Sequence, residues 1–451
     1  MAEGEGPGPK TDCIINKASE ADSGKGPISF LGAVSIGVGG MIGAGVFAIL
    51  GVVASASGSA MWLSFVIGAV VALFATYSYA RLGARFPSAG GPVEFLVHGY
   101  GDNVFTGGVN IFMWIAYVIA ITLYAKGFAA YFMTFFTSSP TSLETKAAAI
   151  GIVALFTIIN FLGAKIVGRS ETYIVVTKVV IIVFFAVTGL FFAKGTQLSP
   201  AGWPGVQDIL FGAGILFIGY EGFGLVTNAA GSMENPSRTL PRALFTSVFI
   251  VMAIYILVAI TVTGNLTLSQ IAASRDHALA QAAKPFLGTF GFKLLAVAAL
   301  FSTASAINAT LFGAANVSFA AAKDGELPRV FSRHEWNGGS GGLLITAGLV
   351  VLFTLLFDLS GISMMGSAAF LLIYAAVNVG HLRIISQTGA RRWVVWVSLI
   401  LCLLMFCLLS IYIFQNSKAA LVALAITLVA SFTGEWVFRR LTARRIKAQT
   451  A

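Results

Sequence analysis

Three ionisable side chains lie well inside long apolar stretches of the sequence: Lys126, Lys178 and Glu221. A charge in an apolar medium costs several kcal/mol unless it is paired or solvated, so such residues are rare there and usually functional. A buried lysine can lose its proton near neutral pH because desolvation disfavours the ammonium. A buried carboxyl group can hold an amine or a proton. These three residues are therefore the first candidates for a site that handles charge.

The segments that carry these residues are suited to a lipid environment. The chain has 451 residues, of which 57% are hydrophobic and 10% are charged, a composition far outside that of soluble domains. Apolar stretches of about 18 or more residues must cross the bilayer as helices, because lipid leaves backbone groups no other partner. We therefore expect an all-α integral membrane protein with 12 transmembrane helices. The stretches are 29–53, 60–80, 105–135, 147–163, 171–193, 208–231, 242–264, 290–321, 342–357, 363–382, 393–414 and 418–438.

The basic residues predict the orientation of the helices. Most of the 28 Lys and Arg residues fall in segments that share the cytosolic side if the N-terminus is cytosolic. We expect a multi-pass protein of the cell membrane whose tails, residues 1–28 and 439–451, are both cytosolic. The net charge of +10 then reflects topology and predicts no nucleic-acid partner. The basic C-terminal tail is expected to be solvated, with contact to anionic membrane lipid as the alternative.

Glycines interrupt two of the apolar stretches, GGMIGAGVF (39–47) in the first and GAGILFIGYEGFG (212–224) in the sixth. Paired interruptions in two halves of opposite orientation are typical of inverted repeats with broken helices. For the first stretch alone, Gly39 and Gly43 also fit a small-residue packing motif. The second instance favours breaks, because each glycine weakens a helix by about 1 kcal/mol. The repeats are expected at residues 29–195 and 206–386, followed by two further helices at 393–438.

A break in the middle of a membrane helix leaves backbone groups free. The outer half of the first stretch begins near Ala44 and Gly45 with free N–H groups, which attract a carboxylate. The outer half of the sixth ends near residues 217–219 with free carbonyls, which attract an ammonium. Together the two ends form a site for a zwitterion, and an α-amino acid is the simplest molecule that carries both groups.

The sequence resembles the amino acid, polyamine and organocation (APC) superfamily of secondary transporters over residues 29–438. The motifs that carry the resemblance are GGMIGAGVF, FPSAGG (86–91), IGYEGFGLVTNAAGSMENPSRTLPRA (218–243) and AAAKDGELP (320–328). The resemblance implies the 5+5 inverted-repeat fold of bacterial leucine transporters, with discontinuous helices 1 and 6 and two additional helices. It also implies that the substrate carboxylate binds amides around Ala44 and Gly45, and that the amine binds the carbonyls of Met41, Ile218 and Glu221.

The charged residues and hydroxyls have alternative roles under this resemblance. Lys178 resembles the lysine of sodium-independent members whose ammonium takes the place of a sodium ion beside the first break. It would couple transport to protons or act as a fixed charge, and snorkelling to the interface is the alternative. The Glu221 side chain would hold the amine of a cationic substrate or a proton, or the residue would contribute only its carbonyl. Lys126 would pair with Glu221 or snorkel.

Three small polar residues of the eighth stretch have a similar ambiguity. Ser302, Thr303 and Ser305 fall where sodium-coupled relatives place hydroxyl ligands. Small polar residues that let helices pack closely are the alternative.

The expected function is secondary active transport of an amino acid or related amine by alternating access, sodium-independent and proton-coupled. Exchange is the alternative, and a non-transporting sensor a remote one. Scattered histidines and cysteines and the lack of a P-loop predict neither an enzyme nor a metal or cofactor, leaving the proton as the coupling ion. Lys178 is the predicted coupling residue and Tyr220 the predicted gate. The predicted substrate-binding residues are Met41, Ile42, Gly43, Ala44, Gly45, Phe217, Ile218, Gly219, Tyr220 and Glu221.

Overall fold

The computed structural model describes residues 28–43, 45–88, 90–137, 139–162, 167–323, 331, 334–335 and 339–442. These residues are almost entirely helical, and one short antiparallel hairpin joins β1 (His334–Glu335) to β2 (Gly339–Ser340). The predicted all-α class is confirmed. The tails before residue 28 and after residue 442 lie outside the described residues.

The helices follow the predicted stretches. The first half contains α2 (Phe30–Met41), α3 (Gly45–Ser57), α4 (Met61–Arg85), α5 (Pro92–Tyr100), α6 (Val104–Met133), α7 (Ser142–Leu162) and α8 (Val167–Leu190). The second half begins with α9 (Val206–Leu216), the 3₁₀ helix η4 (Phe217–Phe223), α10 (Gly224–Asn228) and α11 (Pro236–Asn265). It continues with α12 (Leu268–Ala273), α13 (Ala278–Lys323), α14 (Gly341–Leu356), α15 (Leu359–Arg383) and α16 (Ile385–Thr388). The chain ends in α17 (Arg392–Asn416) and α18 (Lys418–Thr442).

Ten helical stretches of the described residues are long and apolar enough to cross a membrane, and α2 and α14 are shorter apolar helices. Each of the predicted stretches is mostly helical over its described residues. The total of twelve crossings and the inverted repeat stay predictions. One kink divides α13 at Gly288, whose φ of 59° lies in the left-handed region that favours glycine.

Short polar side chains determine where several helices begin. Ser29 accepts a hydrogen bond from the Gly32 N–H at the start of α2, and Asn103 accepts one from the Thr106 N–H at the start of α6. Asp358 does the same for α15. Such N-caps satisfy backbone N–H groups that the first helical turn leaves free.

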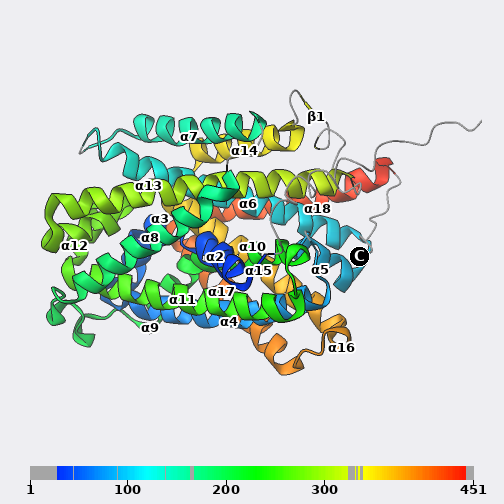
Figure 1. Ribbon diagram of the computed structural model, residues 1–451, viewed down its shortest axis with the longest axis horizontal. Coiled ribbons are helices and arrows are strands. Elements are labelled where there is room, and N and C mark those ends of the chain that lie inside the picture. Colours follow the sequence, from blue (N-terminus) through cyan, green and yellow to red (C-terminus); the bar gives the residue numbers. More distant parts are fainter. Residues whose placement is uncertain are drawn as a thin grey trace, which may run out of the picture.

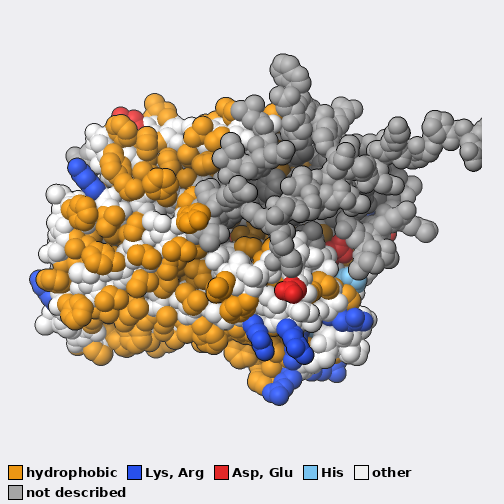
Figure 2. All heavy atoms as spheres, viewed as in Figure 1, with side chains coloured by type: hydrophobic (Ala, Val, Ile, Leu, Met, Phe, Trp, Pro, Cys, Tyr) orange, Lys and Arg blue, Asp and Glu red, His pale blue; other side chains and the backbone are white. Residues whose placement is uncertain are grey.

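The helices form layers around a buried centre (Figure 1). In this view α7 and α14 lie along the top, α4, α9 and α11 lie along the bottom, and α2 lies near the middle. The helices α6 and α15 and the segment from α9 to α10 are buried over most of their length, whereas most residues of α17 and α18 are not buried. Hydrophobic side chains cover much of the visible surface (Figure 2). An exposed apolar surface of this extent fits contact with lipid, and we describe the chain as a multi-pass membrane protein.

Arginines gather at one end of the helix bundle. Arg439 of α18 forms ion pairs with Asp102, just before α6, and with Glu435 one turn earlier. At the same end, Arg383 of α15 lies 4.4 Å from the ring centre of Tyr100. Figure 2 shows further Lys and Arg side chains at the lower right, where Figure 1 places α16. This basic end fits the predicted cytosolic side, and the orientation itself stays a prediction.

Candidate functional site

The first predicted break is present in the structure. Helix α2 ends at Met41, and the Ile42 and Gly43 N–H groups still bond backward, to Val38 at 2.9 Å and Gly40 at 3.3 Å. Helix α3 starts afresh at Gly45, so the helical path is interrupted between Met41 and Gly45. The residue before Gly45, Ala44, lies outside the described residues.

The sixth stretch also leaves the α-helical path. Helix α9 gives way to the tighter η4, all of whose residues are buried, before α10 resumes. Ser367 of α15 bridges the change in geometry. Its hydroxyl oxygen accepts the Ile218 N–H at 3.0 Å and donates to the Ile215 carbonyl at 2.6 Å. The interruption therefore lies within the predicted binding segment.

Glycines let the two breaks touch through their backbones. A methyl group on Gly222 would lie 2.3 Å from the Met41 nitrogen and the Gly40 carbonyl carbon. One on Gly45 would lie 2.8 Å from the Gly219 Cα. Only glycine permits so close an approach. The structure thus brings the predicted carboxylate end and the predicted amine end together.

Two tyrosine hydroxyls occupy carbonyls that the resemblance assigns to the substrate amine. The Tyr255 hydroxyl of α11 lies 2.6 Å from the Met41 carbonyl oxygen and 3.1 Å from that of Gly219. The Tyr374 hydroxyl of α15 donates to the Glu221 carbonyl at 3.2 Å. The sequence analysis identified neither residue, because no motif distinguishes these two tyrosines from the rest of the 11 in the chain.

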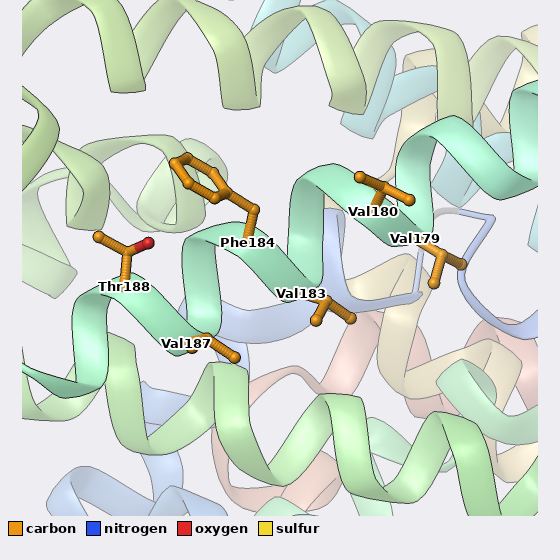
Figure 3. A pocket seen from close by; sticks show the side chains of 6 residues that line it. All are labelled: Val179, Val180, Val183, Phe184, Val187 and Thr188. Carbon is orange, nitrogen blue, oxygen red and sulfur yellow. The ribbon is translucent and has the colours of Figure 1, made fainter.

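Lys178 reaches the first break from α8. Its Nζ donates to the Gly39 carbonyl at 2.9 Å, and the residue is only 2% exposed, so it does not snorkel. The opposite face of α8 carries Val180, Phe184 and Val187, which line an exposed apolar groove of about 490 Å³ (Figure 3). Helix α8 therefore turns an apolar face outward and its lysine inward.

One of the three predicted hydroxyls of α13 also reaches the break. The Ser302 hydroxyl lies 2.7 Å from the Ile42 carbonyl oxygen and 2.6 Å from that of Gly43. The Thr303 hydroxyl instead donates to Ala299 in its own helix at 2.7 Å. Ser302 thus provides a donor where sodium-coupled relatives were expected to place an ion ligand.

Glu221 and Lys126 do not pair within the described part of the chain. Lys126 donates to the Thr354 carbonyl of α14 at 3.0 Å and is buried, so neither the predicted pairing nor snorkelling describes it. Glu221 lines a cavity of about 10 Å³ whose other walls include Tyr79 and Tyr117. A space of this size holds about one water molecule. In this conformation it has no room for the distal amine of a cationic substrate.

The predicted gate, Tyr220, closes the break toward α4. Its hydroxyl donates to the Phe65 carbonyl at 3.1 Å, and its ring centre lies 5.3 Å from that of Tyr255. Phe217 packs against Tyr374 at 5.6 Å between ring centres. These aromatic rings wall the break, and the gating role stays a prediction.

A larger cavity lies apart from the breaks. It has a volume of about 720 Å³ between α6, α15, α17 and α18, and none of the predicted binding residues lines it. Over the described residues, no group of three or more His, Cys, Asp or Glu side chains could hold a metal ion. The breaks therefore remain the candidate site.

The sequence matches known transport proteins along most of its length. The sequence model of a family described as amino acid permease matches residues 28–433. An uncharacterized protein of Methanocaldococcus jannaschii is 41% identical over 418 residues, 92% of this chain and 96% of that protein. The inner membrane transport protein YbaT of Escherichia coli is 31% identical over 423 residues, 94% and 98% of the two chains. The serine/threonine exchanger SteT of Bacillus subtilis is 30% identical over 312 residues, 67% and 70% of the two chains.

Proposed function

Because this chain belongs to the amino acid permease family, we propose that it is a secondary active transporter that carries amino acids across the cell membrane by alternating access. The observation that carries the proposal is the contact between two helix breaks, at Gly45 against Gly219 and at Gly40 against Gly222. The positive end of one helix dipole and the negative end of another then lie side by side. Every α-amino acid presents the two charges that such ends bind.

The two ends of the substrate would bind different helices. The carboxylate would bind at the start of α3, beside Gly45, where the first turn of a helix leaves N–H groups free. The amine would bind carbonyls of Met41, Ile218 and Glu221. The buried position of all three residues supports this assignment, because a dry site strengthens charge recognition.

We further propose that transport is sodium-independent and coupled to protons through Lys178. The Lys178 ammonium donates to the Gly39 carbonyl, and the one proton of the Ser302 hydroxyl is within reach of the Ile42 and Gly43 carbonyls. The positive charge of the Lys178 ammonium beside these carbonyls disfavours a second cation such as sodium at the same place. A buried lysine also changes its protonation more readily than an exposed one.

Exchange of one amino acid for another is the second candidate. It is favoured by the name of one relative, a serine/threonine exchanger. Exchange uses the same site and requires no coupling ion, so uptake that depends on amino acid inside the vesicle would identify it.

The test is uptake by purified protein in liposomes. A panel of alanine, serine, leucine, arginine and putrescine is offered with an inward proton gradient, a sodium gradient or neither. We expect uptake of neutral amino acids that the proton gradient stimulates and sodium does not. Lys178→Ala should lower that uptake by about tenfold or more, because a buried charged hydrogen bond contributes about 1.5–3 kcal/mol.

Lys126→Ala is the matched control, since this second buried lysine bonds a carbonyl of α14 away from the breaks. It should retain the proton stimulation. Uptake by Lys178→Ala that equals the wild type at every pH would contradict the coupling role, and stimulation by sodium would contradict sodium independence. Preference for arginine or putrescine would instead assign the Glu221 side chain to a cationic substrate.

A further inference from the structure

Tyr255 contacts both helix breaks, although no motif singles it out. Its hydroxyl lies 2.6 Å from the Met41 carbonyl oxygen and 3.1 Å from that of Gly219. The side chain is fully buried, and its ring packs between Phe65 and Tyr220, each at 5.3 Å between ring centres. The packing holds the ring in place, whereas the O–H bond can still rotate.

The hydroxyl has one proton for two acceptors. Buried carbonyls without a donor are costly, so the proton favours one carbonyl and leaves the other undersupplied. The shorter distance assigns it to Met41. In the proposed function, the Met41 carbonyl binds the substrate amine. The present inference rests on that function. The amine and the tyrosine hydroxyl therefore seek the same acceptor.

We propose that the Tyr255 hydroxyl takes the place of the substrate amine when the site is empty. This hydroxyl donates to the Met41 carbonyl and must leave that carbonyl when an amine binds. It then turns to the Gly219 carbonyl, which is within reach at 3.1 Å. The longer contact is the weaker one, so each binding event exchanges a good hydrogen bond for a poorer one. Tyr255 is thus a positioning residue that lowers affinity and gives the Met41 carbonyl a donor when the site is empty.

Glycine at position 45 is part of this arrangement. A methyl group there would lie 2.8 Å from the Tyr255 hydroxyl oxygen as well as from the Gly219 Cα. The glycine that opens the carboxylate end of the site therefore also admits the tyrosine that occupies the amine end.

The test is the dissociation constant of Tyr255→Phe for the amino acid that the wild type takes up best in the panel. Removing the hydroxyl removes the competitor, so the variant should bind more tightly by up to about fivefold, because the wild type loses at most one hydrogen bond of ordinary net strength on binding. Without substrate the variant should melt at a lower temperature than the wild type, and substrate should raise its melting temperature by more. A purely structural role would lower stability without tightening binding.

Tyr131→Phe is the matched control. Tyr131 is also fully buried and donates to a carbonyl of the first stretch, that of Phe47 at 3.0 Å, beyond the break. Its loss should leave the dissociation constant unchanged. Equal or weaker binding by Tyr255→Phe would overturn the inference while leaving the proposed function standing. A wild type that takes up no compound of the panel would overturn the proposed function itself.

A second variant keeps the test decisive if Tyr255→Phe is not monodisperse. Replacing Tyr255 with 4-aminophenylalanine by nonsense suppression supplies an uncharged amine with two N–H donors. These can hold the Met41 and Gly219 carbonyls at once, so the substrate should bind several-fold more weakly than to the wild type. Unchanged or tighter binding by this variant would contradict the proposal that the Tyr255 hydroxyl takes the place of the substrate amine.

Discussion

Side chains from four different helices supply the hydrogen-bond donors for the carbonyls of the two breaks. A break frees these carbonyls from their own helix, and no free carbonyl can remain buried without cost. The donors are Lys178 of α8, Tyr255 of α11, Ser302 of α13 and Tyr374 of α15. The breaks are therefore stable only in this tertiary setting, and the donors determine what the empty site offers a ligand.

The Ser302 hydroxyl provides a prediction at the residue scale. Ser302→Ala should lower the free energy of unfolding by about 1–3 kcal/mol, because the variant leaves the Ile42 and Gly43 carbonyls without their donor. The measurement is the thermal midpoint in detergent. Thr303→Val, which removes a hydroxyl bonded only to its own helix among the described contacts, is the control and should change stability little. Equal losses in the two variants would mean that Ser302 contributes no more than a hydroxyl within a helix.

At the scale of elements, backbone contact between α2 and η4 defines the geometry of the site. Bulky side chains at the crossing would hold the two segments apart, and a helix without a break would consume the carbonyls. The glycines achieve both effects at once, since they weaken helical continuity and remove steric bulk. The two glycines of the alternative packing motif lie beside this crossing: Gly39 faces Val175 of α8 and Gly43 faces Ala306 of α13, whereas Gly40 and Gly45 contact the second break.

The crossing can be tested with one methyl group. Gly222→Ala should lower the thermal midpoint and abolish most uptake, because the added carbon would lie 2.3 Å from backbone atoms of Gly40 and Met41, which cannot yield. The control is Gly224→Ala, two residues away, where the nearest atoms lie at 3.8 Å and 3.9 Å. Its thermal midpoint should match or exceed the wild type. A stable, active Gly222→Ala would show that the two breaks need not touch.

At the scale of the whole molecule, exposed apolar side chains and clustered arginines describe how the protein sits in a bilayer. Helices α8, α17 and α18 turn apolar residues outward, including Phe184, Phe414 and Val429. Arg383 and Arg439 mark one end of the bundle through their contacts with Tyr100 and Asp102. This end is the cytosolic side if the positive-inside rule applies.

Cysteine labelling of intact cells tests the orientation. In a variant without the three native cysteines, Thr196→Cys should react with a membrane-impermeant maleimide, because the loop after α8 lies at the end opposite the arginines. Gln387→Cys, in α16, should react only after the cells are permeabilised. Both positions are exposed, so accessibility depends on the side of the membrane alone. The reverse pattern would invert the topology and place both termini outside.

Much of this architecture could be predicted from local sequence. Continuous apolar runs demand helices in lipid, and the glycines of GGMIGAGVF and IGYEGFG indicate where two of them break. The motifs also predicted the family to which the chain belongs. These inferences succeed because hydrophobicity, helix propensity and the bilayer thickness act on residues close together in the chain.

The donors that complete the site could only be read from the tertiary structure. Tyr255 and Tyr374 are 36 and 153 residues from the carbonyls of Gly219 and Glu221 that they contact, and no periodicity relates them. Lys126 appeared to be a candidate partner of Glu221, yet folding brings it to Thr354, 228 residues away. A buried polar atom takes whichever partner the packing of distant helices presents. The sequence alone predicted a zwitterion site between two broken helices, and the fold decided which side chains contact the carbonyls of the two breaks.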